Sequence, residues 1–289
     1  FMVMALGHNP LAIVAGNGDL PRLLAEHCTR TGQEYIIILF AGFAPSWVEN
    51  RPIYKANFEK PARMFKALKD GGFGHVTFAG AMQRPQLRWN KFDLKFWKLA
   101  PKLLPAMKSG DDVTLRMITS IFEAEGIQVI GAHEVLRNLL APLGVQTVAE
   151  MTKAHWVDVK RGMNIAQASG RVDVGQSAVV ADGICLGVES VQGTDAMLNF
   201  VGQTRTNFKL GQQSAKGVLC KAPKPGQDWR IDLPSIGVGT MEAAANAGLG
   251  GVAVQAGGVL VLGLAETVAK ADELGLFFVG VAYDNEAFK

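Results

Sequence analysis

The chain has few residues of the types that build disulfide frameworks or zinc sites. Its three cysteines, Cys28, Cys185 and Cys220, are far apart and odd in number, which argues against both and fits a reducing cytoplasm. Its five histidines form no pair at metal-ligand spacing. Charged residues make up only 19% of the chain and the formal net charge is +3, which is too small to imply nucleic-acid binding. With 48% hydrophobic residues, the chain has the composition of a well-packed globular protein.

Charge is also absent from one long stretch, Ala243–Ala265, which is long enough to span a bilayer. Glycines between Gly248 and Gly263 interrupt this stretch, so we predict a short helix and two buried strands there instead. The first residues, Phe1–Ala5, have no basic region, so we predict no signal peptide.

The first half begins with a strand, a glycine turn, a helix and a second strand. We predict these elements at Leu11–Ala15, Leu20–Thr31 and Glu34–Phe40, an order typical of a dinucleotide-binding βαβ unit. The glycine fingerprint of such units is incomplete, because Pro21 replaces its third glycine and no acid follows the second strand. A nicotinamide cofactor is therefore disfavoured.

The turn of this unit, GNGDLP, keeps the features of a phosphate site. Gly16 and Gly18 allow a tight turn, and Asp19 can cap the helix that follows. Exposed N–H groups at the helix N-terminus could hold a phosphate or a nucleotide. A tight turn without a ligand is the alternative.

Strands and helices continue to alternate after this unit. The loop Gly80–Pro85 follows a predicted strand, at the edge where open α/β sheets bind ligands. Its Gln83 and Arg84 could contact a nucleotide base or phosphate, or they could be solvated. The further elements predicted here are a short strand within Arg51–Phe58, strands at His75–Ala79 and Ile127–Ile130, and helices at Lys60–Leu68, Val113–Glu125 and Ala132–Leu139.

The segment Arg88–Lys108 has a different composition. Its lysines and arginine stand against a single acid, Asp93, and Trp, Phe and Leu are interleaved with them. A short helix with this mixture suits a membrane surface, because cations meet anionic headgroups and aromatic rings sit at the headgroup boundary. Nucleic acid could use the same residues, but nothing else in the chain supports it. An ordinary amphipathic helix is the remaining alternative.

The second half mixes strands and helices in another order. A hairpin is predicted around Asp182-Gly183, a preferred tight-turn pair. The turn Gly193-Thr194-Asp195 offers backbone N–H groups, a hydroxyl and a carboxylate, and Asp195 either caps a helix or contacts a phosphate or metal ion. We predict a Rossmann-like α/β nucleotide-binding domain with a parallel sheet at 8–138. We predict an α+β catalytic domain with a mixed sheet at 148–285. The helices and strands predicted in it are Thr152–Ala168, Lys216–Lys221, Met241–Ala247, Gly251–Gln255, Val259–Leu262, Leu264–Leu274 and Leu276–Val281.

The stretch Lys221–Thr240, KAPKPGQDWRIDLPSIGVGT, combines charge with proline and glycine. Proline and glycine at this density exclude a helix interior or a central strand, so we predict a rigid loop. Cations and carboxylates together suit a phosphate and its metal ion, because carboxylates hold the metal and cations neutralise phosphoryl oxygens. A solvated surface loop is the alternative. The candidate residues are Lys221, Lys224, Gln227, Asp228, Arg230 and Asp232.

Several segments, in this order and spacing, resemble the UDP-2,3-diacylglucosamine pyrophosphatases of lipid A synthesis. The resemblance is to the two-domain type, which is unrelated to the metallophosphoesterase that has the same activity. The pattern K-x-x-K-P-x-Q-D-x-R-x-D-L-P is its most specific part, and Gln192 departs from it where we expect an acid before Gly193. The segments are GNGDLP (16–21), GAMQRP (80–85), GDDVTL (110–115), GTDAML (193–198), the stretch 221–240 and VQAGGVLVL (254–262).

The resemblance implies an enzyme that uses Mg²⁺ to hydrolyse the pyrophosphate, giving UMP and 2,3-diacylglucosamine 1-phosphate. It implies an essential aspartate in QDWRID, which we assign to Asp228 ahead of Asp232, both as metal ligands. Lys221, Lys224 and Arg230 would hold phosphoryl oxygens. Thr194 and Asp195 would complete the site, and the first domain would hold the uridine end. The two alternatives are a pyrophosphatase of a soluble nucleotide sugar and a non-catalytic nucleotide or lipid carrier.

The resemblance also implies a place in the cell. We expect a cytoplasmic enzyme, peripheral on the inner membrane of a Gram-negative bacterium, whose partners are a glycolipid nucleotide and the membrane surface rather than nucleic acid. A homodimer is expected from the frequency of symmetric dimers among soluble oligomers.

Overall fold

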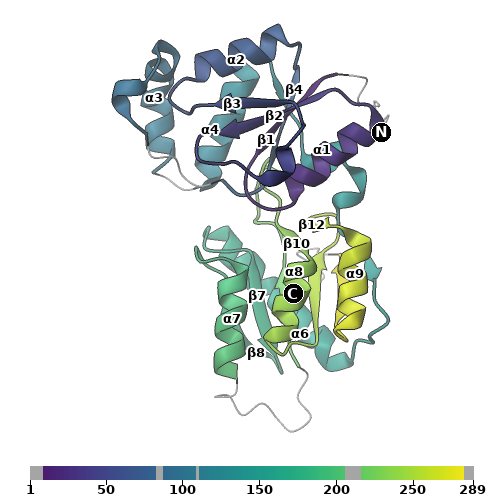
Figure 1. Ribbon diagram of the computed structural model, residues 1–289. Coiled ribbons are helices and arrows are strands. Elements are labelled where there is room, and N and C mark those ends of the chain that lie inside the picture. Colours follow the sequence, from purple (N-terminus) through teal and green to yellow (C-terminus); the bar gives the residue numbers. More distant parts are fainter. Residues whose placement is uncertain (1–8, 83–86, 109–110, 206–215, 283–289) are drawn as a thin grey trace. The chain divides into compact units, whose positions relative to one another are not determined.

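The computed structural model describes residues 9–82, 87–108, 111–205 and 216–282, and the chain forms two compact units (Figure 1). The first unit comprises Phe1–Leu136 together with Asp228–Asp232. The second comprises Arg137–Gln227 and Leu233–Lys289. The chain therefore leaves the second unit for one short segment, Asp228–Asp232, and then returns to it.

The first unit is built on a five-stranded parallel sheet with the order β3-β2-β1-β4-β5. The central strand β1 has the sequence LAIVA and is buried along its whole length, as expected for a parallel strand covered on both faces. This is the doubly wound, Rossmann-like fold that the sequence predicts. The strands are β1 (Leu11–Ala15), β2 (Tyr35–Phe40), β3 (Ile53–Ala56), β4 (His75–Ala79) and β5 (Gln128–Val129).

Helices cover this sheet. Helix α1 packs against β1 and β2, while α2 and α4 contribute Phe65 and Phe122 to the core with the β1 residues Ala12 and Val14. The Phe65 and Phe122 rings meet edge to face with centroids 5.0 Å apart. Helix α3 lies outside this layer, against α2 and α4. The helices are α1 (Leu20–Thr31), α2 (Pro61–Asp70), α3 (Leu94–Ala106), α4 (Asp111–Ala124) and α5 (Ala132–Val135), with short 3₁₀ turns at Ser46–Val48 and Trp89–Lys91.

The second unit contains a mixed six-stranded sheet with the order β6-β13-β11-β9-β7-β8. Strands β9, β11 and β13 are parallel, whereas β7, β8 and β6 pair antiparallel with their neighbours. The mixed sheet agrees with the predicted α+β architecture. Its strands are β6 (Gly144–Val145), β7 (Ser177–Ala181), β8 (Ile184–Val188), β9 (Val218–Lys221), β11 (Gly251–Gln255) and β13 (Phe277–Val281).

Both faces of this sheet are covered. Helix α6 packs Val159 and Met163 on one face, and α7, α8 and α9 pack Leu198, Met241 and Ala271 on the other. The strands β10 and β12 form a separate parallel pair. The remaining elements are α6 (Lys153–Arg171), η3 (Arg137–Leu139), α7 (Thr194–Thr204), β10 (Ser235–Gly237), α8 (Val238–Asn246), β12 (Leu260–Leu262) and α9 (Leu264–Glu273).

Two local predictions were wrong. The C-terminal part of the predicted loop 221–240 forms β10 and the first turn of α8, because β10 finds a parallel partner in β12. Thr240 therefore lies in the first turn of α8, where its Oγ1 accepts a bond from the N–H of Gly237. Asp19 precedes α1 but makes no side-chain cap bond.

The uncharged stretch 243–265 forms the end of α8, the strands β11 and β12 and the start of α9, as a short helix and two strands predict. Across the ranges that the structure describes, no helix combines the length and hydropathy needed to cross a bilayer.

The loops after β1 and β4 approach each other closely at Gly16. The backbones of Asn17 and Ala81 exchange hydrogen bonds of 2.8 and 3.0 Å. A Cβ atom on Gly16 would lie 2.6 Å from the carbonyl oxygens of both Gly80 and Ala81. Packing of these two loops therefore requires glycine at position 16.

We expect Gly16→Ala to lower the free energy of unfolding of the first unit by about 2 kcal/mol, because backbone atoms must move apart to admit the methyl group. Gly74→Ala in the same unit is the control, since its Cβ would meet no atom within 4 Å. Hydrogen exchange of the β1 and β4 amides reports this unit separately. Equal protection in the two variants would contradict the packing argument.

Candidate active site

Lys221 is the last residue of β9 and is only 7% exposed. Along β9, Cys220 faces the core under α6 and Leu219 faces the core under α7 and α8. Because side chains alternate along a strand, Lys221 shares the face of Leu219. Its Nζ donates to Thr194 Oγ1 at 2.8 Å, at the first residue of α7. The structure thus places Thr194 beside Lys221, two residues that the sequence analysis assigned to one site.

A buried carboxylate, Glu189, completes this group. Thr194 Oγ1 donates to Glu189 Oε2 at 3.0 Å, and Ser177 Oγ donates to the same oxygen. Ser177 lies directly opposite Lys221 in the β7–β9 ladder. Neither Glu189 nor Ser177 was a candidate from the sequence, because only the strand pairing brings them to Lys221. We call Ser177, Glu189, Thr194 and Lys221 the Lys221 cluster.

The charge of Lys221 depends on its neighbours. Burial lowers the pKa of Lys221 below its ordinary value, while the carboxylates of Glu189 and Asp195 act in the opposite direction and raise it. Asp195 lies in the first turn of α7, where a negative charge also interacts favourably with the helix dipole. The Lys221 amine is thus buried near two carboxylates, Glu189 of the cluster and the neighbouring Asp195, and its charged form would suit an anionic ligand.

The next residues of the loop form a tight turn. Gln227 N–H donates to Lys224 O at 3.2 Å, and Gly226 has φ 76°. Proline at the second position and glycine at the third, as in Pro225-Gly226, are typical of a type II turn. Gln227 Oε1 also accepts from Lys224 N–H at 3.0 Å, and Lys224 Nζ donates to Asp173 at 2.7 Å. These contacts give Lys224 and Gln227 a part in shaping the loop.

Asp228, Arg230 and Asp232 belong to the first unit. Arg230 Nε and Nη2 bind the two carboxylate oxygens of Asp228 at 2.9 and 2.7 Å, and Arg230 Nη1 binds Glu123 on α4 at 2.7 Å. The side-chain hydrogen bonds from Arg230 lower the pKa of Asp228, so this carboxylate is ionised at neutral pH. Ile231 packs against the core of the first unit. The predicted catalytic set is thus divided between the two units.

The predicted nucleotide-binding residues lie in the first unit. Gly16 is required by the loop contact described above, and Gly18 has φ 94°. Asp19 forms an ion pair with Arg22 at 3.3 Å on the exposed start of α1. Gln83 and Arg84 lie outside the described residues, so their role stays a prediction.

Asp228 could ligate a magnesium ion whose other ligands come from a substrate and water. Within the described ranges, no three His, Cys, Asp or Glu side chains converge on a metal-sized site. Mg²⁺, however, commonly takes one or two carboxylates and fills its remaining positions with phosphates and water. Asp228 Oδ2 accepts one bond from Arg230, at 2.7 Å, and a carboxylate oxygen has two lone pairs. Asp228 can therefore act as a monodentate ligand while it keeps its ion pair.

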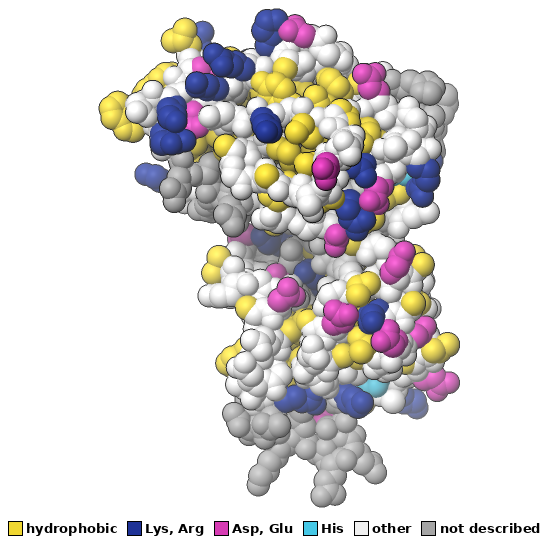
Figure 2. Space-filling model, in the orientation of Figure 1, with side chains coloured by type: hydrophobic (Ala, Val, Ile, Leu, Met, Phe, Trp, Pro, Cys, Tyr) yellow, Lys and Arg dark blue, Asp and Glu magenta, His cyan; other side chains and the backbone are white. Residues whose placement is uncertain are grey.

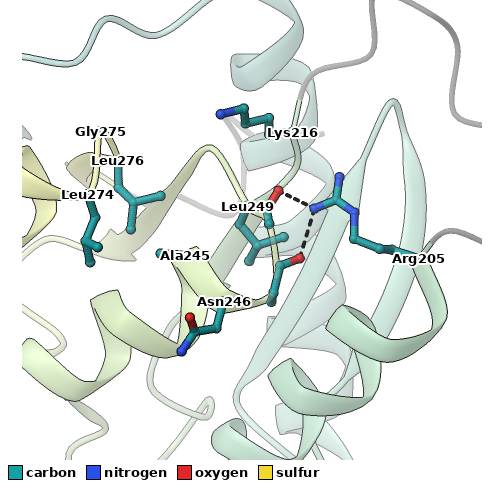
Figure 3. A pocket seen from close by; sticks show the side chains of 10 residues that line it. Arg205, Lys216, Ala245, Asn246, Leu249, Leu274, Gly275 and Leu276 are labelled. Atoms are coloured by element: carbon teal, nitrogen blue, oxygen red, sulfur yellow. Dashed lines mark hydrogen bonds between the residues drawn. The ribbon is translucent and has the colours of Figure 1, made fainter.

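A pocket of about 350 Å³ lies elsewhere in the second unit (Figure 3). Arg205 Nη1 reaches across it to the carbonyl oxygens of Ala247 and Gly248, where α8 ends. Lys216 and Asn246 also line it. None of the predicted site residues lines this pocket, so it supplies no argument about the reaction.

These observations define a two-unit α/β protein with a buried cation cluster in one unit and an arginine-bound aspartate in the other. The family described as the LpxI N-terminal domain matches residues 10–139, and the LpxI C-terminal domain matches 142–279. The chain is 38% identical over 271 residues to the UDP-2,3-diacylglucosamine pyrophosphatase LpxI of Caulobacter vibrioides, covering 94% of this chain and 97% of that protein. The chain belongs to the LpxI family.

A comparison with solved structures gives the crystal structure of an isoflavone reductase, with 11% identity and a TM-score of 0.28 over 96% of this chain and 80% of that one. A likeness at this level carries no argument about fold or activity.

The segment Asp228–Asp232 should depend on Ile231 for its attachment to the first unit. We expect Ile231→Ala to lower the free energy of unfolding of that unit by about 2 kcal/mol, because Ile231 packs against its core. Trp229→Ala is the control in the same segment, since Trp229 is 42% exposed and does not belong to the core of the first unit. The stability of each variant is measured by urea denaturation, with hydrogen exchange of the β1 amides as the probe of the first unit. A loss in Trp229→Ala as large as that in Ile231→Ala would overturn this assignment.

Proposed function

We propose that this chain hydrolyses the pyrophosphate of UDP-2,3-diacylglucosamine to UMP and 2,3-diacylglucosamine 1-phosphate, with Mg²⁺ as cofactor. The observation that carries the proposal is the relationship, over nearly the whole of both chains, to a protein named as UDP-2,3-diacylglucosamine pyrophosphatase. The chemistry of the two residue groups supports it. A buried ammonium in one and an ionised aspartate in the other are groups that a pyrophosphate and its metal ion require.

The roles follow from the contacts of each residue. Asp228 would ligate the metal or orient the attacking water, and Arg230 holds its carboxylate in one orientation through paired hydrogen bonds. Lys221 would donate to a phosphoryl oxygen, and Thr194, at the start of α7, lies beside it. Lys224, Asp195 and Asp232 would support these groups. When bound, Mg²⁺ would offset the negative charge that the pyrophosphate carries in the transition state.

We expect Asp228→Asn to lower kcat at least 100-fold and to change KM by only a few-fold, because metal ligation and water orientation matter most in the transition state. The measurement is phosphorus NMR of UDP-2,3-diacylglucosamine in detergent with Mg²⁺, with EDTA as a metal-free control. Asp70→Asn, which removes an exposed aspartate on α2, is the matched control and should keep wild-type turnover.

Three outcomes separate this function from its alternatives. Loss of binding with unchanged turnover at saturation would remove Asp228 from catalysis. Equal turnover of a UDP-sugar that lacks acyl chains would favour a pyrophosphatase of soluble nucleotide sugars. Binding of the lipid without any hydrolysis in Mg²⁺ would favour a carrier.

We propose further that the chain acts in the cytoplasm, at the surface of the inner membrane, and that α3 makes the contact. The inner face of α3 is occupied, because Phe96, Ala100 and Ala106 are buried. Its outer face presents Leu94, 83% exposed, and Trp97, 52% exposed. Trp89, in the preceding turn, is 75% exposed. Figure 2 shows hydrophobic and basic side chains together over the part of the first unit where Figure 1 places α3.

The basic side chains of this face are available to headgroups. Lys98 and Lys102 lie on the exposed side of α3, next to the apolar strip, and neither has an ion pair among the residues that the structure describes. Lys95, by contrast, pairs with Glu125 at 2.5 Å and is turned towards Phe65. The acid of the segment, Asp93, is occupied by the N–H groups of Phe96 and Ala62.

The charge on this face favours an anionic membrane over a second copy of the chain. A symmetric contact through α3 would place the lysines of both copies together, whereas an anionic headgroup layer attracts them. Pro101 and Pro105 also lie within α3 and on its exposed side. They remove two N–H donors from the helix, which is tolerated at an exposed, hydrated position such as a headgroup layer.

We expect Lys98→Glu/Lys102→Glu to weaken binding to vesicles of phosphatidylglycerol and phosphatidylcholine at least tenfold, because each cation near an anionic surface contributes about 1 kcal/mol. Trp97→Ser should weaken it as well. The matched controls lie on α6 of the second unit: Lys153→Glu/Lys160→Glu changes the net charge equally, and Trp156, 46% exposed, matches Trp97. Co-sedimentation measures binding. Equal losses in the α6 variants, or equal binding to phosphatidylcholine alone, would contradict a role for α3.

A further inference from the structure

The polar end of the second sheet contains a carboxylate whose position serves Lys221. On the face under α7 and α8, β7 and β9 bury Val179 and Leu219, and the next residues outward on that face are Ser177 and Lys221. The apolar core therefore gives way to polar side chains at this end. Glu189, 9% exposed, lies against them from the loop after β8. A carboxylate this deeply buried costs free energy unless hydrogen bonds and a nearby cation compensate for the lost water.

We infer that Glu189 is a positioning residue for Lys221: it fixes the Thr194 hydroxyl as an acceptor for the Lys221 ammonium and supplies the negative charge that keeps this ammonium protonated in a buried site. This inference rests on the proposed function, in which Lys221 binds a phosphoryl oxygen.

The hydrogen bonds of the Thr194 hydroxyl run in one direction, from Lys221 to Glu189. Thr194 has one hydroxyl proton, and it donates this proton to Glu189 Oε2 at 3.0 Å. Its lone pairs then face Lys221 Nζ, which donates to Thr194 Oγ1 at 2.8 Å. Without an acceptor at Glu189, the hydroxyl could rotate and present its proton to Lys221. The carboxylate therefore decides the orientation of Thr194 and, through it, one bond of the ammonium.

The position of the Glu189 carboxylate is defined by its own hydrogen bonds. Ser177 Oγ donates to the oxygen that also accepts from Thr194, so two hydroxyls from different elements hold this carboxylate. Ser177 is held opposite Lys221 by the β7–β9 ladder, and Thr194 by the start of α7. The distance from Glu189 to the ammonium is thus set by the sheet and a helix terminus, which are rigid elements.

Burial and nearby negative charge act in opposite directions on the pKa of Lys221. Two carboxylates raise its pKa, Glu189 and Asp195, against the burial that lowers it. The strand residues paired with Lys221 on its two sides, Ser177 and Val254, carry no titratable group. Since an ammonium must stay charged to attract a phosphoryl oxygen, removing the Glu189 charge should let Lys221 lose its proton at a lower pH.

We expect Glu189→Gln to move the alkaline limb of the kcat profile about one pH unit lower, because the amide keeps the size of the side chain and loses its charge. Glu189→Asp should restore the limb towards wild type. Glu242→Gln, an exposed residue of α8, removes the same charge outside the cluster and is the matched control.

A second readout separates this inference from the proposed reaction. The ¹³Cε resonance of Lys221, assigned with Lys221→Arg, gives its titration without substrate. A lower titration midpoint in Glu189→Gln supports the inference, even if the wild-type chain hydrolyses no pyrophosphate and the proposed function fails. An unchanged midpoint in a variant whose β7 and β9 amides keep wild-type hydrogen exchange would overturn it.

Discussion

Removing the ammonium of Lys221 from water is the constraint around which the polar end of the second unit is arranged. A buried cation is tolerated only with hydrogen bonds and opposite charge nearby. The structure meets both needs with residues from three elements, Ser177 on β7, Glu189 after β8 and Thr194 at the start of α7. Such a group contributes little to folding stability, because an apolar residue at the end of β9 could fill the same face without the cost of removing charge from water. Its retention is understandable if the ammonium serves an anionic ligand.

Most of the fold could be predicted because its signals are local. Short apolar runs such as LAIVA, broken by glycine, identify buried parallel strands, and proline near a helix start with glycine after its end bounds α1. The predicted loop 221–240 failed at Ser235–Gly237 for a reason that lies elsewhere in the chain. Three residues between Pro234 and α8 carry no strand pattern of their own, and they form β10 only because β12 offers a parallel edge.

The site was harder to predict because it depends on pairing and orientation. Lys221 and Thr194 were chosen for their chemistry, and the contact between them confirms only that they are neighbours. Glu189 could not be found, since the expected acid was sought at position 192, whereas the structure uses an earlier residue of the same loop. Asp228 and Arg230 were assigned to a metal and to a phosphate, and the sequence did not indicate that they bind each other. Nor did it indicate that their segment packs with the first unit.

Arg230, Lys221 and Lys98 have different partners, and these partners indicate different roles for the three side chains. Arg230 binds the carboxylates of Asp228 and Glu123, so its charge serves to hold these two side chains in place. Lys221 has a hydroxyl as its direct partner, and the carboxylates of Glu189 and Asp195 raise its pKa against the lowering effect of burial. Lys98 lies beside exposed tryptophan with no acid to pair with among the described residues. A lysine in water gains nothing from the apolar strip beside it, and a helix in a protein core would bury that strip. We proposed the membrane contact because a lipid headgroup layer is both anionic and apolar, and so matches the lysines and the strip together.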